Sequence, residues 1–358
     1  MYRRLPHGST QTLEQLQPKA VEGGYVLTKP IHVPPGDIGF GVKAYDRQQG
    51  TRNLNGVFII ESRVEGVVHW RSRYDTVAFE DSRYIQAHYD FAAKHDGDGY
   101  FYRMHRLPGD ALSLYEAAPD DGYVALGFGE SCAMETTVAD PFGNTSILRY
   151  TVVADQPEVE PFAPSYNFLL RRGRDTSYAV ADALLSISSL AMYTNTYLDV
   201  EVSDMPVEGA YTRCYTLGDA REPIHASAKL RVPLHDVPMH LRPNAYLSAC
   251  DDATENIHFG SLSTGSTHLE VGMEEWSALT LRVDTLPPSI RKLDRYTYLL
   301  EDEVTPASAL RYRVSQNNQW VLAGFDAKRN RLELRRDKLG EGPVAVEVWD
   351  VAGNRREL

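Results

Sequence analysis

The sequence contains few cysteines, three in 358 residues. Cys132, Cys214 and Cys250 are odd in number, lie far apart and form no C-x-x-C pair. A disulfide framework or a zinc knuckle is expected from an even set or from such closely spaced pairs. The spacing therefore implies neither a disulfide framework nor a zinc knuckle. We predict that the three cysteines are small residues in strands or loops, and their individual roles stay open.

Long apolar runs and an excess of positive charge are absent as well. No stretch approaches the roughly 20 apolar residues that a membrane-spanning helix needs, so we expect no membrane span. The 37 Lys and Arg stand against 49 Asp and Glu, which gives a net charge of −12. Because nucleic-acid binding depends on a basic surface, this balance argues against a nucleic-acid partner.

A secretory signal is not visible either. The first residues, MYRRLPHGSTQTLEQL, carry two arginines but no apolar stretch behind them. This start predicts a cytoplasmic chain, unless Met1 is not the natural beginning of the protein.

Alternation of apolar and polar residues dominates what is present. In YLDVEV, Leu198, Val200 and Val202 would share one face of a strand, and ALTLRVD (278–284) and PVAVEVWD (343–350) repeat the pattern. A period of two residues indicates β-strands, and turn residues separate them at short intervals. We therefore predict an all-β fold made of tandem immunoglobulin-like β-sandwich modules.

One segment follows a helical period instead. In DSRYIQAHYDFAAKH (81–95) the apolar residues recur at helical spacing, Ser82 is a candidate N-cap and Gly97 a candidate end. The pattern predicts a short helix near 82–95 within the first module.

Two proline-containing segments divide the chain. QPEVEPFAP (156–164) and DTLPPSI (284–290) would act as stiff spacers, because proline fixes its own φ and extends the preceding residue. The predicted modules are 1–155, 164–284 and 285–358.

The motif D-x-x-G-N occurs twice, each time after a predicted strand of alternating apolar and polar residues. The Asp carboxylate can accept hydrogen bonds from turn amides, and glycine adopts positive φ without steric cost. We predict two structural hairpin turns without a catalytic role, formed by Asp140, Gly143 and Asn144 and by Asp350, Gly353 and Asn354.

Several longer segments resemble those of a known protein family. These are GDIGFGVKAYDRQQGTRNLNGVFIIESRVEG (36–66), YDTVAFEDSRYIQAHYDF (74–91), VADPFGNTSILRYTV (138–152), DTLPPSI, NNQWVLAGFDAKRNRLEL (317–334) and VEVWDVAGN (346–354). Their order resembles the C-terminal, non-catalytic region of large bacterial lysostaphin-type zinc metalloendopeptidases, which cleave peptidoglycan. The portion between the two spacers is similar more loosely.

The zinc-binding spacing of that family is missing from this chain. In the family, zinc ligands come from H-x-x-x-D and H-x-H, and zinc requires its ligands to converge at about 2 Å. The eleven histidines include no pair one residue apart and none with Asp four positions later; the nearest approach is His32 with Asp37, five apart. We expect no catalytic residue and no cofactor in this chain, with zinc only in a catalytic domain that it lacks.

The resemblance implies a non-catalytic accessory region that positions or braces an upstream catalytic domain. The expected partners are that peptidase domain or cell-wall peptidoglycan, and the expected location is the cell envelope (periplasm or cell surface) if Met1 is not the natural start. The alternative is a free-standing surface protein that binds a glycan or a protein partner through loops at the sandwich ends. A third hypothesis is that the chain itself hydrolyses a substrate.

Other candidate residues favour structural roles. Ser131 in GFGESCA has a loose nucleophile-elbow setting, but the following CAMETTVAD predicts a strand where a helix is needed. Asp96 and Asp98 in HDGDGY begin like a calcium loop, yet Leu107 stands where a bidentate Glu is required.

Two further features also favour structural roles. His235 and His240 lie five apart across a proline with no further ligands in view, and we interpret them as exposed loop residues. The aromatic stretch RSRYDTVAFEDSRYIQAHYDF (71–91) can form a contact surface, but we favour packing on its own module.

Overall fold

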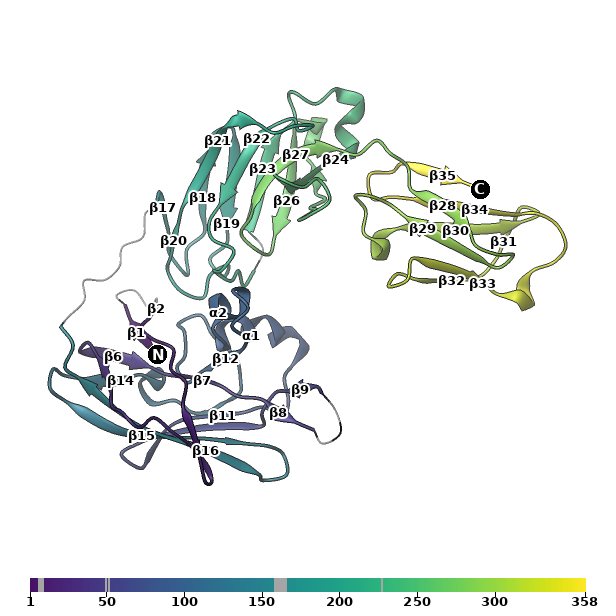
Figure 1. The fold of residues 1–358 in the computed structure, drawn as a ribbon. Helices are drawn as coiled ribbons and strands as arrows, with labels where there is room; N and C mark the ends of the chain where they lie inside the picture. Colours follow the sequence, from purple (N-terminus) through teal and green to yellow (C-terminus); the bar gives the residue numbers. More distant parts are fainter. Residues whose placement is uncertain (6–9, 49, 51, 158–165, 227) are drawn as a thin grey trace.

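A computed structural model describes the chain except residues 6–9, 49, 51, 158–165 and 227. It is mostly β and consists of several antiparallel sheets with a short helical segment near residue 80, which confirms the predicted fold class. The strands gather into three groups that follow one another along the chain (Figure 1). No helix in the described ranges is long and apolar enough to cross a membrane.

The first group contains two larger sheets and two strand pairs. One sheet has the order β14 (Val124–Leu126), β6 (Gly36–Gly39), β1 (Tyr2–Arg4), β2 (Thr10–Thr12). The other has the order β13 (Tyr115–Ala117), β11 (Val67–Arg73), β10 (Ile59–Val64), β15 (Ser131–Ala139), β16 (Thr145–Ala154), β4 (Gly24–Val26), β3 (Lys19–Val21), with β5 (Ile31–Val33) also on β16. The pairs are β12 (Phe101–Arg103) with β7 (Gly41–Lys43) and β8 (Asp46–Arg47) with β9 (Leu54–Asn55).

The middle group is a two-sheet sandwich with an extra strand pair. Its sheets are β18 (Thr176–Val180), β19 (Ala183–Ile187), β23 (Ala228–Pro233), β26 (His268–Met273), β25 (Ser261–Leu262) and β21 (Val200–Pro206), β22 (Arg213–Leu217), β27 (Ala278–Val283), β24 (Ala245–Ala249). The pair is β17 (Phe168–Leu170) with β20 (Thr196–Leu198).

The last group is a sandwich of two four-stranded sheets. They are β28 (Ser289–Lys292), β29 (Thr297–Glu301), β33 (Arg331–Leu334), β32 (Ala323–Asp326) and β31 (Gln319–Trp320), β30 (Arg311–Gln316), β34 (Val344–Trp349), β35 (Arg355–Glu357). We refer to the three groups as the first, middle and third modules.

Each module buries its own hydrophobic core, built from the inward-facing residues of its alternating strands. Trp70 lies in the first core and Trp276 in the middle one, both almost fully buried. The third core is smaller and includes Val346 and Val348 of β34. Because each sheet has its own apolar face covered, the modules have the architecture of separately packed sandwiches. The module boundaries themselves stay a prediction, and the spacer 156–164 lies almost wholly outside the described residues.

The helical segment is broken into short pieces. The 3-10 helix Phe79–Tyr84 (η2) leads into α1 (Ile85–His88), and α2 (Phe91–His95) follows. Tyr89 between them is extended and bridges to Tyr102, so one continuous helix over 82–95 does not form. The carboxylate of Asp90, and not Ser82, caps α2 by accepting a hydrogen bond from Ala93 N.

Gly97 ends α2 as the sequence predicts. Its φ of 86° lies in the left-handed region, and Asp98 N donates to Ala93 O in the pattern of a Schellman motif. Five further 3-10 helices occur in the described residues, at Pro119–Gly122, Met239–Asn244 (η4), Thr264–Ser266, Ala307–Ala309 and Arg336–Lys338.

The two D-x-x-G-N segments adopt the same turn. Each joins two paired strands, β15 to β16 and β34 to β35. Asp140 Oδ2 accepts from Asn144 Nδ2 at 2.6 Å, and Asp350 Oδ2 accepts from Asn354 Nδ2 at 2.8 Å. The intervening Gly143 and Gly353 have φ of 88° and 91°, where a Cβ would be strained.

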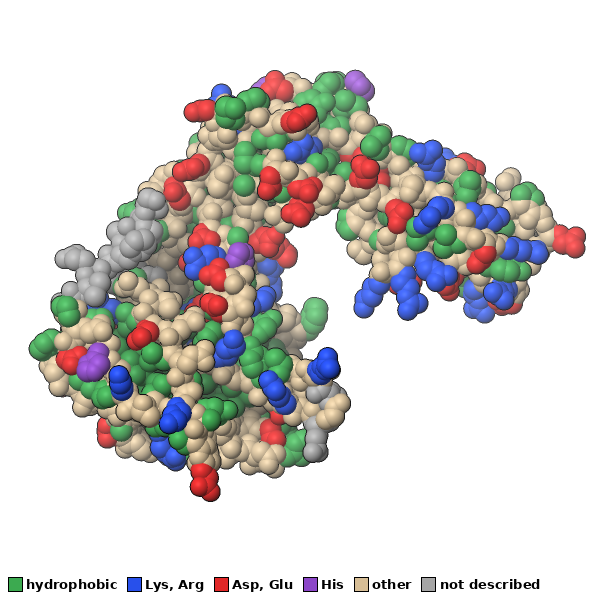
Figure 2. All heavy atoms as spheres, viewed as in Figure 1, with side chains coloured by type: hydrophobic (Ala, Val, Ile, Leu, Met, Phe, Trp, Pro, Cys, Tyr) green, Lys and Arg blue, Asp and Glu red, His purple; other side chains and the backbone are tan. Residues whose placement is uncertain are grey.

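Charge is distributed unevenly over the modules. Residues 285–358 contain 13 Lys and Arg against 11 Asp and Glu, although the whole chain carries a net −12. Figure 2 shows the basic side chains of the third module on the face toward the viewer. The acidic excess therefore belongs to the first two modules.

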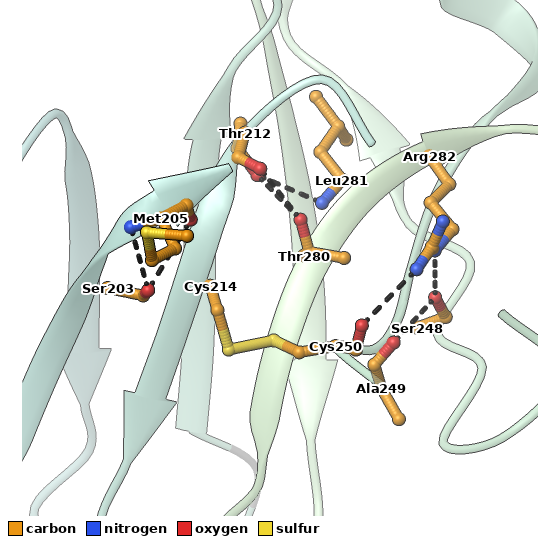
Figure 3. The surroundings of a disulfide bond; sticks show 10 residues. All are labelled: Ser203, Met205, Thr212, Cys214, Ser248, Ala249, Cys250, Thr280, Leu281 and Arg282. Atoms are coloured by element: carbon orange, nitrogen blue, oxygen red, sulfur yellow. Dashed lines mark hydrogen bonds between the residues drawn. A yellow bond between two sulfur atoms is a disulfide. The ribbon is translucent and has the colours of Figure 1, made fainter. Parts of the chain in front are cut away.

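A disulfide joins Cys214 to Cys250, which corrects the prediction that the cysteines imply no bridge. Cys214 lies in β22 and Cys250 directly after β24, and both strands pair with β27 (Figure 3). Their 36-residue separation hides this proximity, because the sheet order and not the sequence spacing brings them together. Cys132 is a buried thiol in β15 of the first module.

Candidate functional site

The helical segment of the first module docks on the middle module. The ring of Tyr84 stacks on that of His225 with centroids 4.1 Å apart, and Tyr193 Oη donates a hydrogen bond to Arg83 O at 2.5 Å. Tyr193 is almost fully buried in a small cluster with Ala87 of α1. The aromatic stretch 71–91 therefore contributes to a contact between modules as well as packing on its own module.

Ion pairs and one close backbone approach complete this contact. Arg83 Nη1 lies 3.1 Å from Glu274 Oε1, and Arg221 Nη2 lies 2.9 Å from Asp96 Oδ2. Such partly exposed pairs contribute little stability each, about 0–1 kcal/mol. A methyl group at Gly109 would lie 2.6 Å from both Cα and O of Tyr193, so only glycine fits at this position without a shift of backbone.

A cleft of about 480 Å³ opens beside the docking contact. The first module lines it with residues from β2, the α1–α2 segment and β12, among them Gln11, Gln86, Asp90 and Arg103. The middle module lines it with residues from 192–197 and from 218–223. The walls thus come from two modules, and loops at one end of the middle sandwich form one of them.

A buried ion pair lies in the wall of this cleft. Asp90 Oδ2 accepts a hydrogen bond from Tyr2 Oη at 2.9 Å, and Arg103 Nη2 lies 3.8 Å from Asp90 Oδ1. Arg103 Nε donates to Tyr89 O at 3.2 Å, which fixes the guanidinium. Burial raises the pKa of Tyr2, so this phenol stays protonated and acts as a donor.

Three polar atoms of cleft residues are buried and have no hydrogen-bond partner among the described residues: Arg103 Nη1, Gln86 Oε1 and Gln11 Oε1. Buried polar groups in proteins are nearly always hydrogen-bonded, and each one left unpaired costs about 1–3 kcal/mol. Arg103 offers a donor and the two glutamines offer acceptors. Because these atoms are buried, a ligand in the cleft would reach them only if the wall of the cleft shifted.

A second polar network lies inside the first module. His88 Nε2 contacts Tyr74 Oη at 2.5 Å and His88 Nδ1 contacts Tyr115 Oη at 3.0 Å, while Tyr115 Oη donates to Asp110 Oδ2. Burial lowers the pKa of His88 to about 3, and Arg103 adds to the effect, so the ring is neutral. His88 is 1% exposed, and we interpret the network as a support for α1.

The structure places the other candidate catalytic and metal-binding residues of the sequence far from one another. Ser131 is exposed at the start of β15, paired with Val153, in a strand and not at a strand-to-helix turn. His235 is exposed and lies 3.1 Å from Asp236, and His240 is exposed in η4. Asp96 and Asp98 belong to the turn that ends α2.

One group of three potential metal ligands occurs within the described ranges, and none of its members is a histidine or a cysteine. One carboxylate oxygen each from Asp284, Asp302 and Asp350 lies within 4.8 Å of the others. Burial raises the pKa of Asp284 to about 6, and the nearby charges of Asp302 and Asp350 act in the same direction. Of the three residues, only Asp350 was singled out in the sequence, as a turn residue.

Comparison with protein families finds a match in the middle of the chain. A family model described as a Zu5-like domain matches residues 169–297. The match begins in β17, spans the middle module and ends at the first residue of β29, past the predicted boundary at 284. No curated protein sequence matches the chain. The molecule is thus a β-rich, multi-sheet protein with a Zu5-like domain, and the match covers less than half of it.

Proposed function

We propose that this chain is a non-catalytic accessory region of a cell-envelope peptidoglycan metalloendopeptidase, which positions or braces a catalytic domain upstream. The observation that carries the proposal is the docking contact of Tyr84 and Tyr193 between the first two modules. A bracing region needs modules that keep their relative orientation, and a buried aromatic contact supplies this better than a bare linker does. The proposal also rests on the sequence resemblance.

The disulfide supports an envelope location. Disulfides form and persist in oxidising compartments and are rare in the cytosol. The bond between Cys214 and Cys250 lies within the Zu5-like region. We therefore propose that this region works outside the cytoplasm.

The test is the genomic reading frame upstream of the Met1 codon, together with an assay of the purified chain. We expect an upstream segment that encodes H-x-x-x-D and H-x-H, and no digestion of purified murein by the chain alone. A promoter and ribosome-binding site directly before the Met1 codon would contradict the accessory role. Murein digestion that requires stoichiometric zinc in this chain would replace it with a hydrolase.

A second candidate function, ligand binding by a surface protein, is favoured by the cleft. The polar side chains that line it, among them those of Gln11, Gln86 and Arg103, suit a polar ligand. Sedimentation with murein sacculi measures such binding. We expect Gln86→Ala to weaken it by roughly fivefold, the effect of about one hydrogen bond. Gln319→Ala, on the exposed strand β31 of the third module, is the matched control and should bind as the parent does. No sedimentation of the parent chain would remove this candidate and leave the bracing role.

A further inference from the structure

Three aspartates meet at the junction between the middle and third modules. Asp284 directly follows β27, Asp302 directly follows β29, and Asp350 directly follows β34. Asp284 and Asp350 are each only 4% exposed. Since one oxygen of each carboxylate lies within 4.8 Å of the other two, up to three negative charges share a small, largely buried volume.

This arrangement differs from that of Glu61 and Asp90, two other buried carboxylates of the protein. Glu61 accepts from Arg63 at 2.8 Å and from Arg71 at 2.6 Å, and Asp90 lies beside Arg103. Among the residues that the structure places, no Lys or Arg pairs with Asp284, Asp302 or Asp350. A buried charge without a partner is strongly unfavourable, so this cluster needs a cation from solution or bound protons.

An unsatisfied atom provides a second, independent observation. Asp284 Oδ1 accepts a hydrogen bond from Leu286 N at 3.0 Å, but Asp284 Oδ2 is buried with no partner in the described structure. The hydrogen bonds of Asp302 fall on its Oδ1, from Val304 N at 3.0 Å and Thr305 N at 2.6 Å. Backbone amides thus orient these two carboxylates while one oxygen of each stays available.

We propose that Asp284, Asp302 and Asp350 bind one calcium ion at the junction between the middle and third modules. Ca²⁺ takes oxygen ligands at about 2.3–2.6 Å, so two of its ligands lie at most about 5 Å apart. The 4.8 Å limit on the three oxygens is compatible with one such coordination sphere. Mg²⁺ binds at about 2.0–2.1 Å and demands octahedral geometry with several waters, so a cluster held by backbone turns suits it less well.

The ion would join parts that the chain already holds close. Asn244 of the middle module donates through Nδ2 to Ala352 O and Asn354 Oδ1, both at 3.2 Å, and Asn354 Nδ2 donates to Asp284 O at 3.1 Å. An ion on the linker residue Asp284 and on two loops of the third module adds a strong cross-link to these neutral bonds. Calcium would therefore fix the orientation of the third module, whether or not the bracing role is correct.

The experiment uses the full chain, stripped of ions with EDTA and exchanged into chelator-free buffer at pH 7.5. The stripped protein is titrated calorimetrically with CaCl2 and, in a separate run, with MgCl2. We expect one saturable Ca²⁺ site per chain, weaker binding of Mg²⁺, and a higher Tm with Ca²⁺. Asp302→Asn should weaken Ca²⁺ binding by about tenfold or more, because one of three charged ligands is lost. In the stripped protein the same change should leave Tm equal or higher, since it removes repulsion.

The repeated turn provides the control. Asp140 occupies the same D-x-x-G-N position as Asp350, but it lies in an exposed hairpin of the first module, outside the cluster. Asp140→Asn should leave the Ca²⁺ affinity unchanged. The proposal fails if the parent chain shows neither saturable binding nor a Tm shift, or if Asp302→Asn binds Ca²⁺ as tightly as the parent does.

Discussion

At the residue scale, the buried polar groups of the first module differ from those at the junction of the middle and third modules. In the first module His88 satisfies both ring nitrogens with tyrosines, and His105 Nδ1 contacts Phe40 O at 3.1 Å. The sequence gives no sign of this, because His88 occurs at helical spacing like its apolar neighbours. Asp350 was predictable as a turn residue from its motif, whereas its approach to Asp284 and Asp302 depends on the path of three separate strands.

The two buried histidines predict a pH dependence of stability. Burial lowers the pKa of His88 to about 3 and lowers that of His105 well below its usual range. Below pH 6.5 the unfolded chain gains protons that the folded module does not, so the free energy of unfolding falls as pH falls. Each histidine contributes up to about 1.4 kcal/mol per pH unit. Urea unfolding between pH 6.5 and 5.0 should show this slope, and His88→Gln should reduce it by up to about 1.4 kcal/mol per pH unit. His240→Gln, at an exposed site, is the control; an unchanged slope in His88→Gln would contradict the assignment.

At the element scale, the alternation of apolar and polar residues and the turn residues predict the strands well. They predict the contacts between strands poorly. The alternating runs 278–283 and 344–349 are observed as β27 and β34, because each has one buried face. The helix at 82–95 was only partly predicted, since periodicity does not reveal that Tyr89 pairs with Tyr102 and that Asp90 starts a new helix. The disulfide was missed because two strands 36 residues apart meet through a third.

The disulfide predicts a thiol count and a loss of stability. In denaturant without reductant we expect one thiol per chain, that of Cys132, and three after reduction, by reaction with Ellman's reagent. Closing a loop of this length stabilises the folded state by roughly 3–4 kcal/mol in the chain-entropy model. Cys214→Ala with Cys250→Ala should lower the free energy of unfolding of the middle module by that order, whereas Cys132→Ala should leave the disulfide intact. Three thiols before reduction would mean that the bond does not form.

At the scale of the whole molecule, three sandwiches are held by two different junctions. The first junction is an aromatic docking contact and the second consists of asparagine hydrogen bonds beside the acidic cluster. The division into modules at the two proline-containing segments stays a prediction from the sequence. Neither the cleft nor the cluster could be predicted, because each combines residues from both sides of a junction.

Gly109 tests whether the first two modules are docked in solution. Gly109→Ala places a methyl group 2.6 Å from the backbone of Tyr193, so we expect the docking contact to open while both cores persist. Hydrogen exchange at residues 83–88 and 191–197 should become faster, and the radius of gyration from X-ray scattering should rise. Gly324→Ala, where a Cβ meets nothing within 4 Å, should change neither quantity. Identical exchange in the two variants would show that the contact is not populated.

The disulfide also has a mechanical consequence. When a chain anchored at both ends is pulled, an unfolded segment lengthens by about 3.3–3.6 Å per residue. The covalent link between Cys214 and Cys250 removes 36 residues, or about 120 Å, from the length that the middle module can release. Under tension this module could therefore release only the length of the residues outside that loop, while the third module, which has no cysteine, could extend fully.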